Sequence, residues 1–201
     1  HRVAVGRQHD VAPLGRRTVG RTPRPRREDG DDRERRKGSL QQHVTKEFTV
    51  RSMPDVVIDS PVGLLRLTAS GHALTGVALN AEGVPTAATP DGVLGVAVRQ
   101  LGEYFAGSRR AFDLPLEPAG TPFQHRVWMA LVEIPFGETV AYGEIASRIG
   151  RPDAVRAVGA ANGQNPIPII IPCHRVIGAD GSLTGFAFGE TTKRRLLALE
   201  R

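Results

Sequence analysis

The chain has 201 residues, of which 40% are hydrophobic and 24% charged, the proportions of a globular protein with a sizeable core. Its single cysteine excludes a disulfide framework and a structural zinc held by several cysteines. No apolar run approaches the roughly 20 residues that cross a bilayer, and the first residues lack the pattern of a secretory signal. We therefore expect a cytoplasmic protein that does not bind membranes.

The net charge of +6 is concentrated near the start of the sequence. Residues 1–52 hold 14 Lys and Arg against 7 Asp and Glu, whereas residues 53–201 hold 13 against 14. Because residues 1–52 also lack apolar periodicity, we predict a disordered basic leader there. It is either a DNA-tethering arm or an upstream extension without function, since Met53 directly precedes the first patterned segment. The high pI therefore does not indicate that the rest of the chain binds nucleic acid.

The patterned part of the sequence predicts an α+β fold. Short apolar runs separated by Pro- and Gly-containing turns predict an antiparallel meander over residues 56–61, 63–70 and 73–80. Apolar residues at near-helical spacing then predict a helix over 93–105. These elements form a small N-terminal module, residues 53–118, in which no residues have the chemistry of an active site.

Residues 119–201 predict a second, mostly helical module. A helix begins at Thr121 or Pro122. Further on, a short helix ends at Gly150, and Pro152 suits the first position of another helix over 153–161. Two short helices joined by a tight turn are typical of a helix-turn-helix, although such pairs also occur as plain core.

One arginine stands out on the second helix of this pair. Arg156 lies outside the predicted apolar face, beside Gly159 and Ala160; that face holds Ala154, Val155, Ala157, Val158 and Ala161. Arg156 is either a solvated helix residue or a cation on a small-residue surface that can closely approach a duplex.

The only cysteine lies in the most informative stretch, residues 165–185. Prolines alternating with Ile167 and Ile169–Ile171 predict an extended, buried approach to Cys173. A lone buried cysteine is usually a small hydrophobe. A nucleophilic thiolate, however, needs a nearby cation or base, and His174 and Arg175 follow directly.

A carboxylate in the last helix is a candidate partner for that imidazole. Glu200 falls on the apolar stripe of the segment 193–201, at the angle between Leu196 and Leu197. It is also near a helix C-terminus, where negative charge is unfavourable. Either it has a specific partner, such as an imidazole or an arginine, or it is a frayed penultimate residue in water.

Several segments resemble, in this order and spacing, the O6-alkylguanine-DNA alkyltransferase family: TPFQHRVW, IPFGETVAYGEIA, RAVGAANGQNP, IIIPCHRVIGADGSLTGF and LLALE. The resemblance covers roughly residues 55–201 and is strongest over 121–200. It implies a single-turnover methylated-DNA–protein-cysteine S-methyltransferase, with residues 119–201 as the DNA-binding and catalytic module. Such a protein repairs DNA by moving an alkyl group irreversibly from O6-alkylguanine to its own cysteine; O4-alkylthymine is a candidate further substrate.

The resemblance also implies roles for individual residues. Cys173 is the nucleophile that becomes a thioether, and His174 draws its proton through a bound water while Glu200 holds the imidazole. Tyr142 protonates or bonds the leaving guanine, and Asn165 braces the turn before the cysteine.

The implied partner is double-stranded DNA containing O6-alkylguanine, bound by a monomer without a cofactor. The target base must leave the stack before its O6 can reach a buried thiol. Arg156 enters the stack in its place, and the helix-turn-helix lies in the minor groove, where Arg151, Ala157 and Ala160 contact the DNA.

The implied substrate pocket departs from the family pattern. Its lining residues are Val176, Phe186, Ala187 and Phe188. The family usually has Gly-Tyr where this chain has Gly185–Phe186, which loses a hydroxyl, and Phe188 stands at a position that can be small. Some relatives hold zinc through cysteines in the N-terminal module; none stands there in this sequence, so we predict no metal.

Two other functions compete with this interpretation. One is a sensor that recognises alkylguanine without removing the alkyl group, but relatives of that kind lack the cysteine that is present here as Cys173. The other is a turnover hydrolase that uses Cys173, His174 and Glu200, and the predicted helix-turn-helix argues against it.

Overall fold

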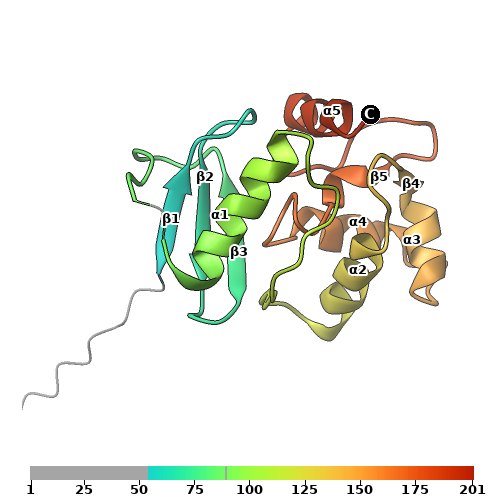
Figure 1. Ribbon diagram of the computed structural model, residues 1–201. Coiled ribbons are helices and arrows are strands. Elements are labelled where there is room, and N and C mark those ends of the chain that lie inside the picture. Colours follow the sequence, from blue (N-terminus) through green and yellow to red (C-terminus); the bar gives the residue numbers. More distant parts are fainter. Residues whose placement is uncertain (1–53, 89) are drawn as a thin grey trace, which may run out of the picture. The chain divides into compact units, whose positions relative to one another are not determined.

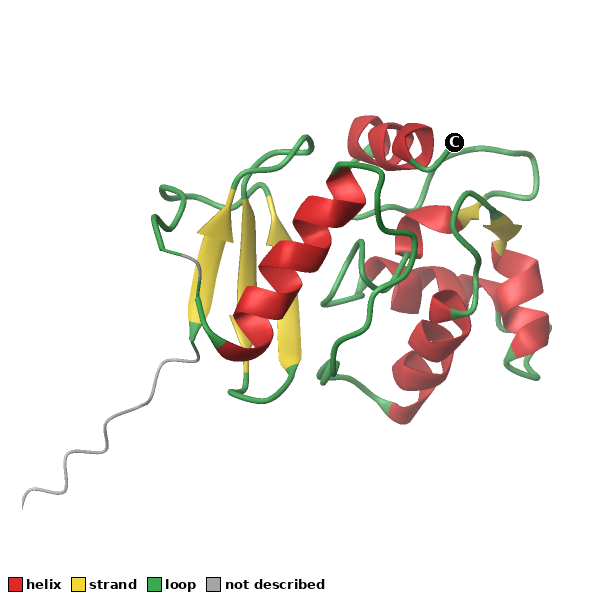
Figure 2. Cartoon of the chain, in the orientation of Figure 1, coloured by secondary structure: helices red, strands yellow, loops and turns green. Residues whose placement is uncertain are grey.

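The structure is a computed structural model that describes residues 54–88 and 90–201 (Figure 1). The predicted disordered leader, residues 1–52, lies outside the described residues. Within the described part the architecture is α+β, as the sequence predicts: an antiparallel sheet with one helix comes first, and short helices dominate the rest (Figure 2).

The antiparallel meander forms as predicted. Three strands lie in the order β1-β2-β3 and comprise Asp55–Ile58, Leu65–Ala69 and Leu74–Leu79. On β2 every second side chain is fully buried, namely those of Leu65, Leu67 and Ala69, which is the period expected of a strand with one face in the core. The helix α1, Gly92–Phe105, contacts all three strands (Figure 1).

The remaining elements are short. They are α2 (Pro122–Val132), β4 (Val140–Ala141), α3 (Tyr142–Arg148), α4 (Val155–Gly163), a 3-10 helix (Cys173–Arg175), β5 (Val176–Ile177) and α5 (Glu190–Leu199). Helix α2 begins at a capping box, in which Thr121 and Gln124 satisfy each other's backbone N–H groups. The indole of Trp128 donates to the carbonyl of Ala161, at 2.9 Å, and so ties α2 to α4.

The second helix of the predicted pair begins later than expected. Pro152 is not its first residue; α4 starts at Val155. The N–H of Ala154 donates to the carbonyl of Arg151, at 2.9 Å, so residues 151–154 form a turn. Proline is favoured at the second position of such a turn because its ring fixes φ, and this competes with the helix-start preference.

The burial of α4 also differs in part from the predicted face. Val158 and Ala161 are buried as expected, whereas Val155 and Ala157 are exposed. Because α2 and α3 both pack on α4, its buried stripe is set by their positions and is narrower than the helical periodicity alone indicates.

None of the described helices is both long and apolar enough to span a membrane. The boundary near residue 118 between the two predicted modules stays a prediction.

Candidate active site

The single cysteine lies in the 3-10 helix Cys173–Arg175, deep in the protein. Cys173 is 2% exposed and the His174 side chain after it is fully buried. The N–H of Cys173 donates to the carbonyl of Ile171, at 2.8 Å, and its own carbonyl accepts from the amide of Asn162, at 3.3 Å. Helix α4 therefore contacts the backbone that carries the thiol.

The approach to Cys173 is buried as predicted, but it is a turn and not an extended segment. The N–H of Ile171 donates to the carbonyl of Ile167, at 2.9 Å, and Ile169 has a φ of +75°, a conformation that is rare for a β-branched residue. Asn165 holds both arms of the turn: its Oδ1 accepts from the N–H of Ile167, at 3.0 Å, and its Nδ2 donates to the carbonyl of Ile171, at 2.8 Å. The proline spacing alone did not reveal this side-chain anchor.

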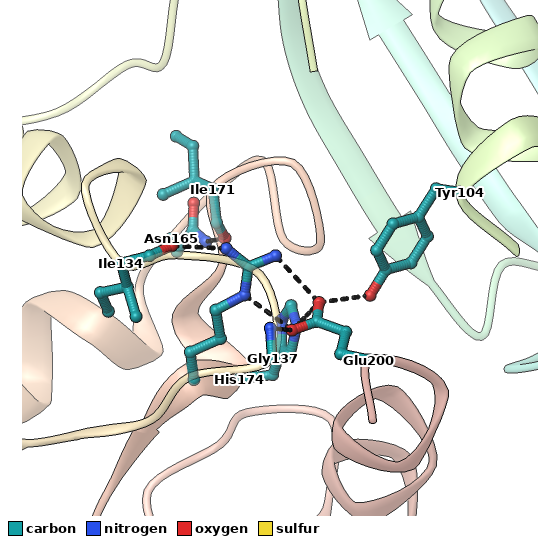
Figure 3. A network of polar contacts seen from close by, with 8 residues as sticks. Tyr104, Ile134, Gly137, Asn165, Ile171, His174 and Glu200 are labelled. Carbon is teal, nitrogen blue, oxygen red and sulfur yellow. Dashed lines mark hydrogen bonds and ion pairs between the residues drawn. The ribbon is translucent and has the colours of Figure 1, made fainter. Parts of the chain in front are cut away.

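The carboxylate of Glu200 is the centre of the buried polar network (Figure 3). Its Oε1 lies 2.8 Å from Nε2 of His174 and accepts from the hydroxyl of Tyr104, at 2.7 Å. Arg175 donates to both carboxylate oxygens, from Nε at 2.8 Å and Nη2 at 3.0 Å, and the N–H of Gly137 adds a longer bond of 3.3 Å to Oε2. Glu200 thus has both kinds of partner that its place on the apolar stripe predicts, an imidazole and an arginine.

These contacts determine the charge of Glu200. Burial by itself raises the pKa of a carboxyl group, but the hydrogen bonds from His174 and Arg175 outweigh burial and lower the pKa of Glu200 to about 2. Glu200 is therefore ionised throughout the physiological range, and the adjacent guanidinium neutralises it.

The thiol and the imidazole are both neutral at pH 7. Burial raises the pKa of the Cys173 thiol to about 11, and burial lowers the pKa of His174. Because a carboxylate can only accept a hydrogen bond, the ring proton of His174 is on Nε2, and Nδ1 is left as an acceptor. The site therefore holds a protonated thiol next to an unprotonated base.

Two buried side-chain polar atoms have no hydrogen-bond partner among the described residues, and both adjoin the cysteine. They are Nδ1 of His174, the next residue in the chain, and Oδ1 of Asn162, whose amide nitrogen bonds the Cys173 carbonyl. Buried unsatisfied groups are costly and are concentrated where a protein binds or reacts. Their position marks the surroundings of Cys173 as the reactive part of the site.

Lys193 is a buried cation near the thiol that the sequence analysis did not identify. Its Nζ donates to the carbonyls of Val176, at 2.6 Å, and Thr184, at 3.2 Å, and burial lowers its pKa. The proximity of this cation partly offsets the effect of burial on the pKa of Cys173. A signal was present in the sequence: Lys193 shares the apolar stripe of α5 with Leu196 and Glu200.

Tyr142 begins α3 and reaches the loop before α5. Its hydroxyl donates to the carbonyl of Thr184, at 3.2 Å, and burial raises its pKa, so the phenol stays protonated. Gly185, with a φ of +77°, lies so close to this hydroxyl that any side chain there would collide with it. A glycine at this position lets the loop pack against the phenol.

The predicted pocket residues lie in β5 and in the loop before α5. Val176 is fully buried and Phe186 nearly so, Phe188 is half-buried and Ala187 is exposed. The rings of Phe186 and Phe188 meet edge to face with centroids 5.5 Å apart. Two aromatic rings therefore occupy the loop next to Tyr142.

The predicted DNA-contacting residues are all exposed. Arg156, Ala157 and Ala160 lie on α4, and Arg151 lies in the turn before it, with Nε 3.8 Å from the carboxylate of Asp153. Among residues 54–88 and 90–201, no three His, Cys, Asp or Glu side chains are grouped so that they could hold a metal ion.

Comparisons with known proteins give consistent results. A model of the DNA-binding domain of 6-O-methylguanine DNA methyltransferase matches residues 122–201, and a model of its ribonuclease-like domain matches residues 56–118. The methylated-DNA–protein-cysteine methyltransferase of Mycobacterium bovis is 55% identical over 148 residues, which cover 72% of this chain and 90% of that protein. The chain belongs to the 6-O-methylguanine DNA methyltransferase family. This confirms the resemblance seen in the sequence.

Solved structures of 6-O-methylguanine DNA methyltransferases share the fold. The crystal structure of Mycobacterium tuberculosis OGT in complex with DNA has a TM-score of 0.65 and 54% identity, covering 72% of this chain and 90% of that one. A methyltransferase of Methanococcus jannaschii, with 28% identity, has a TM-score of 0.53 and covers 72% of this chain and 92% of its own.

Within this family fold five residues predicted from the sequence lie near one another, whereas Arg156 is exposed on α4; the five are Cys173, His174, Glu200, Asn165 and Tyr142. The structure adds Tyr104 to the buried network of Glu200, and it places Asn162 and Lys193 near Cys173. The roles of all these residues stay predictions.

Proposed function

We propose that this protein is a methylated-DNA–protein-cysteine methyltransferase, which repairs DNA by transferring the alkyl group of O6-alkylguanine to Cys173. The observation that carries the proposal is the buried Cys173, followed directly in the 3-10 helix by His174, whose Nε2 lies 2.8 Å from the carboxylate of Glu200. The relatives with this name and the family's DNA-binding domain over residues 122–201 support the same activity.

The chemistry is a single displacement at carbon. Sγ of Cys173 attacks the alkyl carbon, a sulfur–carbon bond forms, and the bond from that carbon to O6 breaks. A protonated thiol is a poor nucleophile, so Nδ1 of His174 takes the thiol proton, directly or through a water molecule. Glu200 stabilises the resulting imidazolium because its carboxylate accepts a hydrogen bond from the Nε2–H group.

The leaving guanine gains a proton as the thiol loses one, so the net change moves one alkyl group and one proton. The Tyr142 phenol is the proposed donor or hydrogen-bond partner for the guanine, since its raised pKa keeps it protonated. Water does not hydrolyse the thioether that forms on Cys173. Each protein molecule therefore repairs one lesion and is consumed.

Access to the base requires that it leave the duplex. We propose that α4 lies in the minor groove, with exposed Ala157 and Ala160 allowing close approach and exposed Arg156 filling the gap in the stack. Arg151 is the proposed backbone contact at the start of this surface. A monomeric state and a cytoplasmic location stay predictions from the sequence.

Intact-mass analysis tests the proposed function. The protein is incubated with excess duplex that contains one O6-methylguanine, and then digested to locate any added group. We expect a single added methyl on the peptide with Cys173, none in the Cys173→Ala variant, and none with unmodified duplex. Binding without any adduct would instead indicate a lesion sensor, and released product in excess of protein would indicate a turnover hydrolase.

A further inference from the structure

One group in the buried network comes from the sheet-and-helix part of the chain, which comprises the described residues up to 118 and contains β1–β3 and α1. Tyr104, in the last turn of α1, is fully buried, and its ring packs against those of Phe105, Phe112 and Phe136. Its hydroxyl donates a 2.7 Å hydrogen bond to Oε1 of Glu200, 96 positions further along the chain (Figure 3). The phenol is the only polar side chain that α1 contributes to the network drawn there.

The oxygen that Tyr104 bonds is also the one that holds the base. Oε1 of Glu200 lies 2.8 Å from Nε2 of His174 and 3.0 Å from Nη2 of Arg175. Each donor withdraws negative charge from the oxygen they share, so each weakens the attraction of that oxygen for the others. The strength of the His174–Glu200 contact therefore depends on whether the phenol is present.

We propose that Tyr104 is a positioning residue for alkyl transfer, whose hydroxyl fixes Oε1 of Glu200 and reduces the basicity of the His174 imidazole held by that oxygen. The inference rests on the proposed function, because His174 is the base of that reaction. It makes the sheet-and-helix part of the chain, which has no reactive group of its own, a determinant of the reaction rate.

Other charged and titratable groups also act on His174. Glu200 and Lys193 approach from α5, and Cys173 and Arg175 flank His174 in the 3-10 helix. Glu200 favours the imidazolium, whereas burial, Arg175 and Lys193 disfavour it. The Tyr104 phenol does not itself titrate in the working range, since burial and the Glu200 charge raise its pKa far above the ordinary value.

Tyr104→Phe removes one oxygen atom and keeps the ring. Without the phenol, Oε1 carries more negative charge and binds the Nε2 proton more strongly. At pH 7 we expect the NMR signal of that proton to move downfield relative to the wild type, with the signal assigned by its absence from His174→Gln. The pKa of His174 should rise by about 0.5 to 1 pH unit. The acid limb of the pH–rate profile, where the methyl-transfer rate falls because His174 is protonated, should move to higher pH by the same amount.

Phe112→Leu is the matched control. It loosens the packing of the Tyr104 ring, because the two rings lie 5.4 Å apart, but it leaves the hydroxyl in place. It should lower thermal stability without moving the Nε2 proton or the acid limb. If Tyr104→Phe slows transfer equally at every pH and leaves the Nε2 proton unchanged, the residue is merely structural and the inference is wrong.

The NMR readout needs no DNA and separates the two proposals. Suppose that the wild type transfers no methyl group but the Nε2 proton signal still moves downfield in Tyr104→Phe. That result would overturn the proposed function and leave the contact between Tyr104, Glu200 and His174 established. Methyl transfer by the wild type, with identical NMR signals and acid limbs in both proteins, would overturn the role of Tyr104 alone.

Discussion

The sheet-and-helix part of the chain and the part that carries Cys173 bury very different side chains. Within the described residues up to 118, the only polar groups on buried side chains are the amide of Gln100 and the hydroxyl of Tyr104. Beyond residue 118 the buried set includes two amides and four ionisable groups: Asn162, Asn165, His174, Arg175, Lys193 and Glu200. Apolar burial is sufficient to stabilise a fold, whereas buried charge is costly. Each buried charge therefore depends on its partner, so changes in residues 119–201 should affect stability or reaction more than matched changes in residues 54–118, and four tests examine this difference.

The largest expected effect is the loss of stability when a fully buried carboxylate is replaced, compared with a half-buried one. Glu200→Gln leaves the Arg175 guanidinium buried without its counter-charge and should lower the free energy of unfolding by about 3–5 kcal/mol. Glu103→Gln removes a half-buried partner of Arg109 on the sheet-and-helix side and should cost at most about 1 kcal/mol. Urea unfolding of both variants measures the difference, and equal losses would contradict the comparison.

The second test is the acid stability of the wild type. The pKa of Glu200 is about 2 in the folded protein against an ordinary value of 4.5, so the folded state binds fewer protons than the unfolded state. This stabilisation is present above pH 4.5 and lost as the pH falls toward 2, and it amounts to about 3 kcal/mol. His174, with a lowered pKa, adds a loss of the same sign below pH 6.5. Unfolding free energies measured across this range should fall much less steeply in Glu200→Gln.

The third test compares two exposed arginines. Arg156→Ala on α4 should slow repair of duplex DNA about a hundredfold, because the gap left by the extruded base is no longer filled, while the reaction with free O6-methylguanine changes little. Arg99→Ala on α1 removes a similarly exposed cation and should affect neither reaction. Single-turnover rates of the wild type and both variants, measured on duplex DNA and on the free base, test this prediction. Equal losses on duplex and free base would mean that Arg156 acts structurally.

The smallest expected effect concerns two half-buried phenylalanines. If Phe188 fills space beside the alkyl group, a benzyl group fits poorly, and Phe188→Gly should speed the reaction with O6-benzylguanine about tenfold relative to O6-methylguanine. Phe112→Ala, on the sheet-and-helix side, should leave the ratio of the two rates unchanged. A wild type that accepts the benzyl compound readily, with no change in Phe188→Gly, would place Phe188 outside the pocket.

The sequence predicts the regular elements well because their limits are set by local chemistry. Helix α2 begins at Pro122, as the sequence indicates, and a glycine with positive φ, Gly107, follows α1. Three predictions were wrong: the helix start at Pro152, part of the buried face of α4 and the extended approach to Cys173. The first and the third occur where proline is compatible with more than one conformation. In the turn before Cys173 the deciding contact is made by the side chain of Asn165, which a backbone pattern does not contain.

A residue of the candidate site can be predicted from the sequence in two cases. Either it lies next to another site residue in the chain, or it places a charge on the apolar face of a helix. Cys173 and His174 are neighbours, and Glu200 breaks the polarity pattern of α5, so all three were found. Lys193 breaks the same pattern, but its partners, the carbonyls of Val176 and Thr184, become apparent only in three dimensions. Tyr104 fits the apolar face of α1, and nothing local distinguishes its hydroxyl from a buried ring edge.

The contacts of Glu200 also bear on when reactivity arises during folding. Its donors lie 96, 63 and 26 positions away along the chain, at Tyr104, Gly137 and His174. Contacts of such high sequence separation form late, because loop-closure entropy must be overcome first. A partly folded chain therefore has the cysteine but not the assembled base. For a protein that is consumed by one reaction, the His174–Glu200 pair that accepts the thiol proton is thus completed only with the fold that recognises the target.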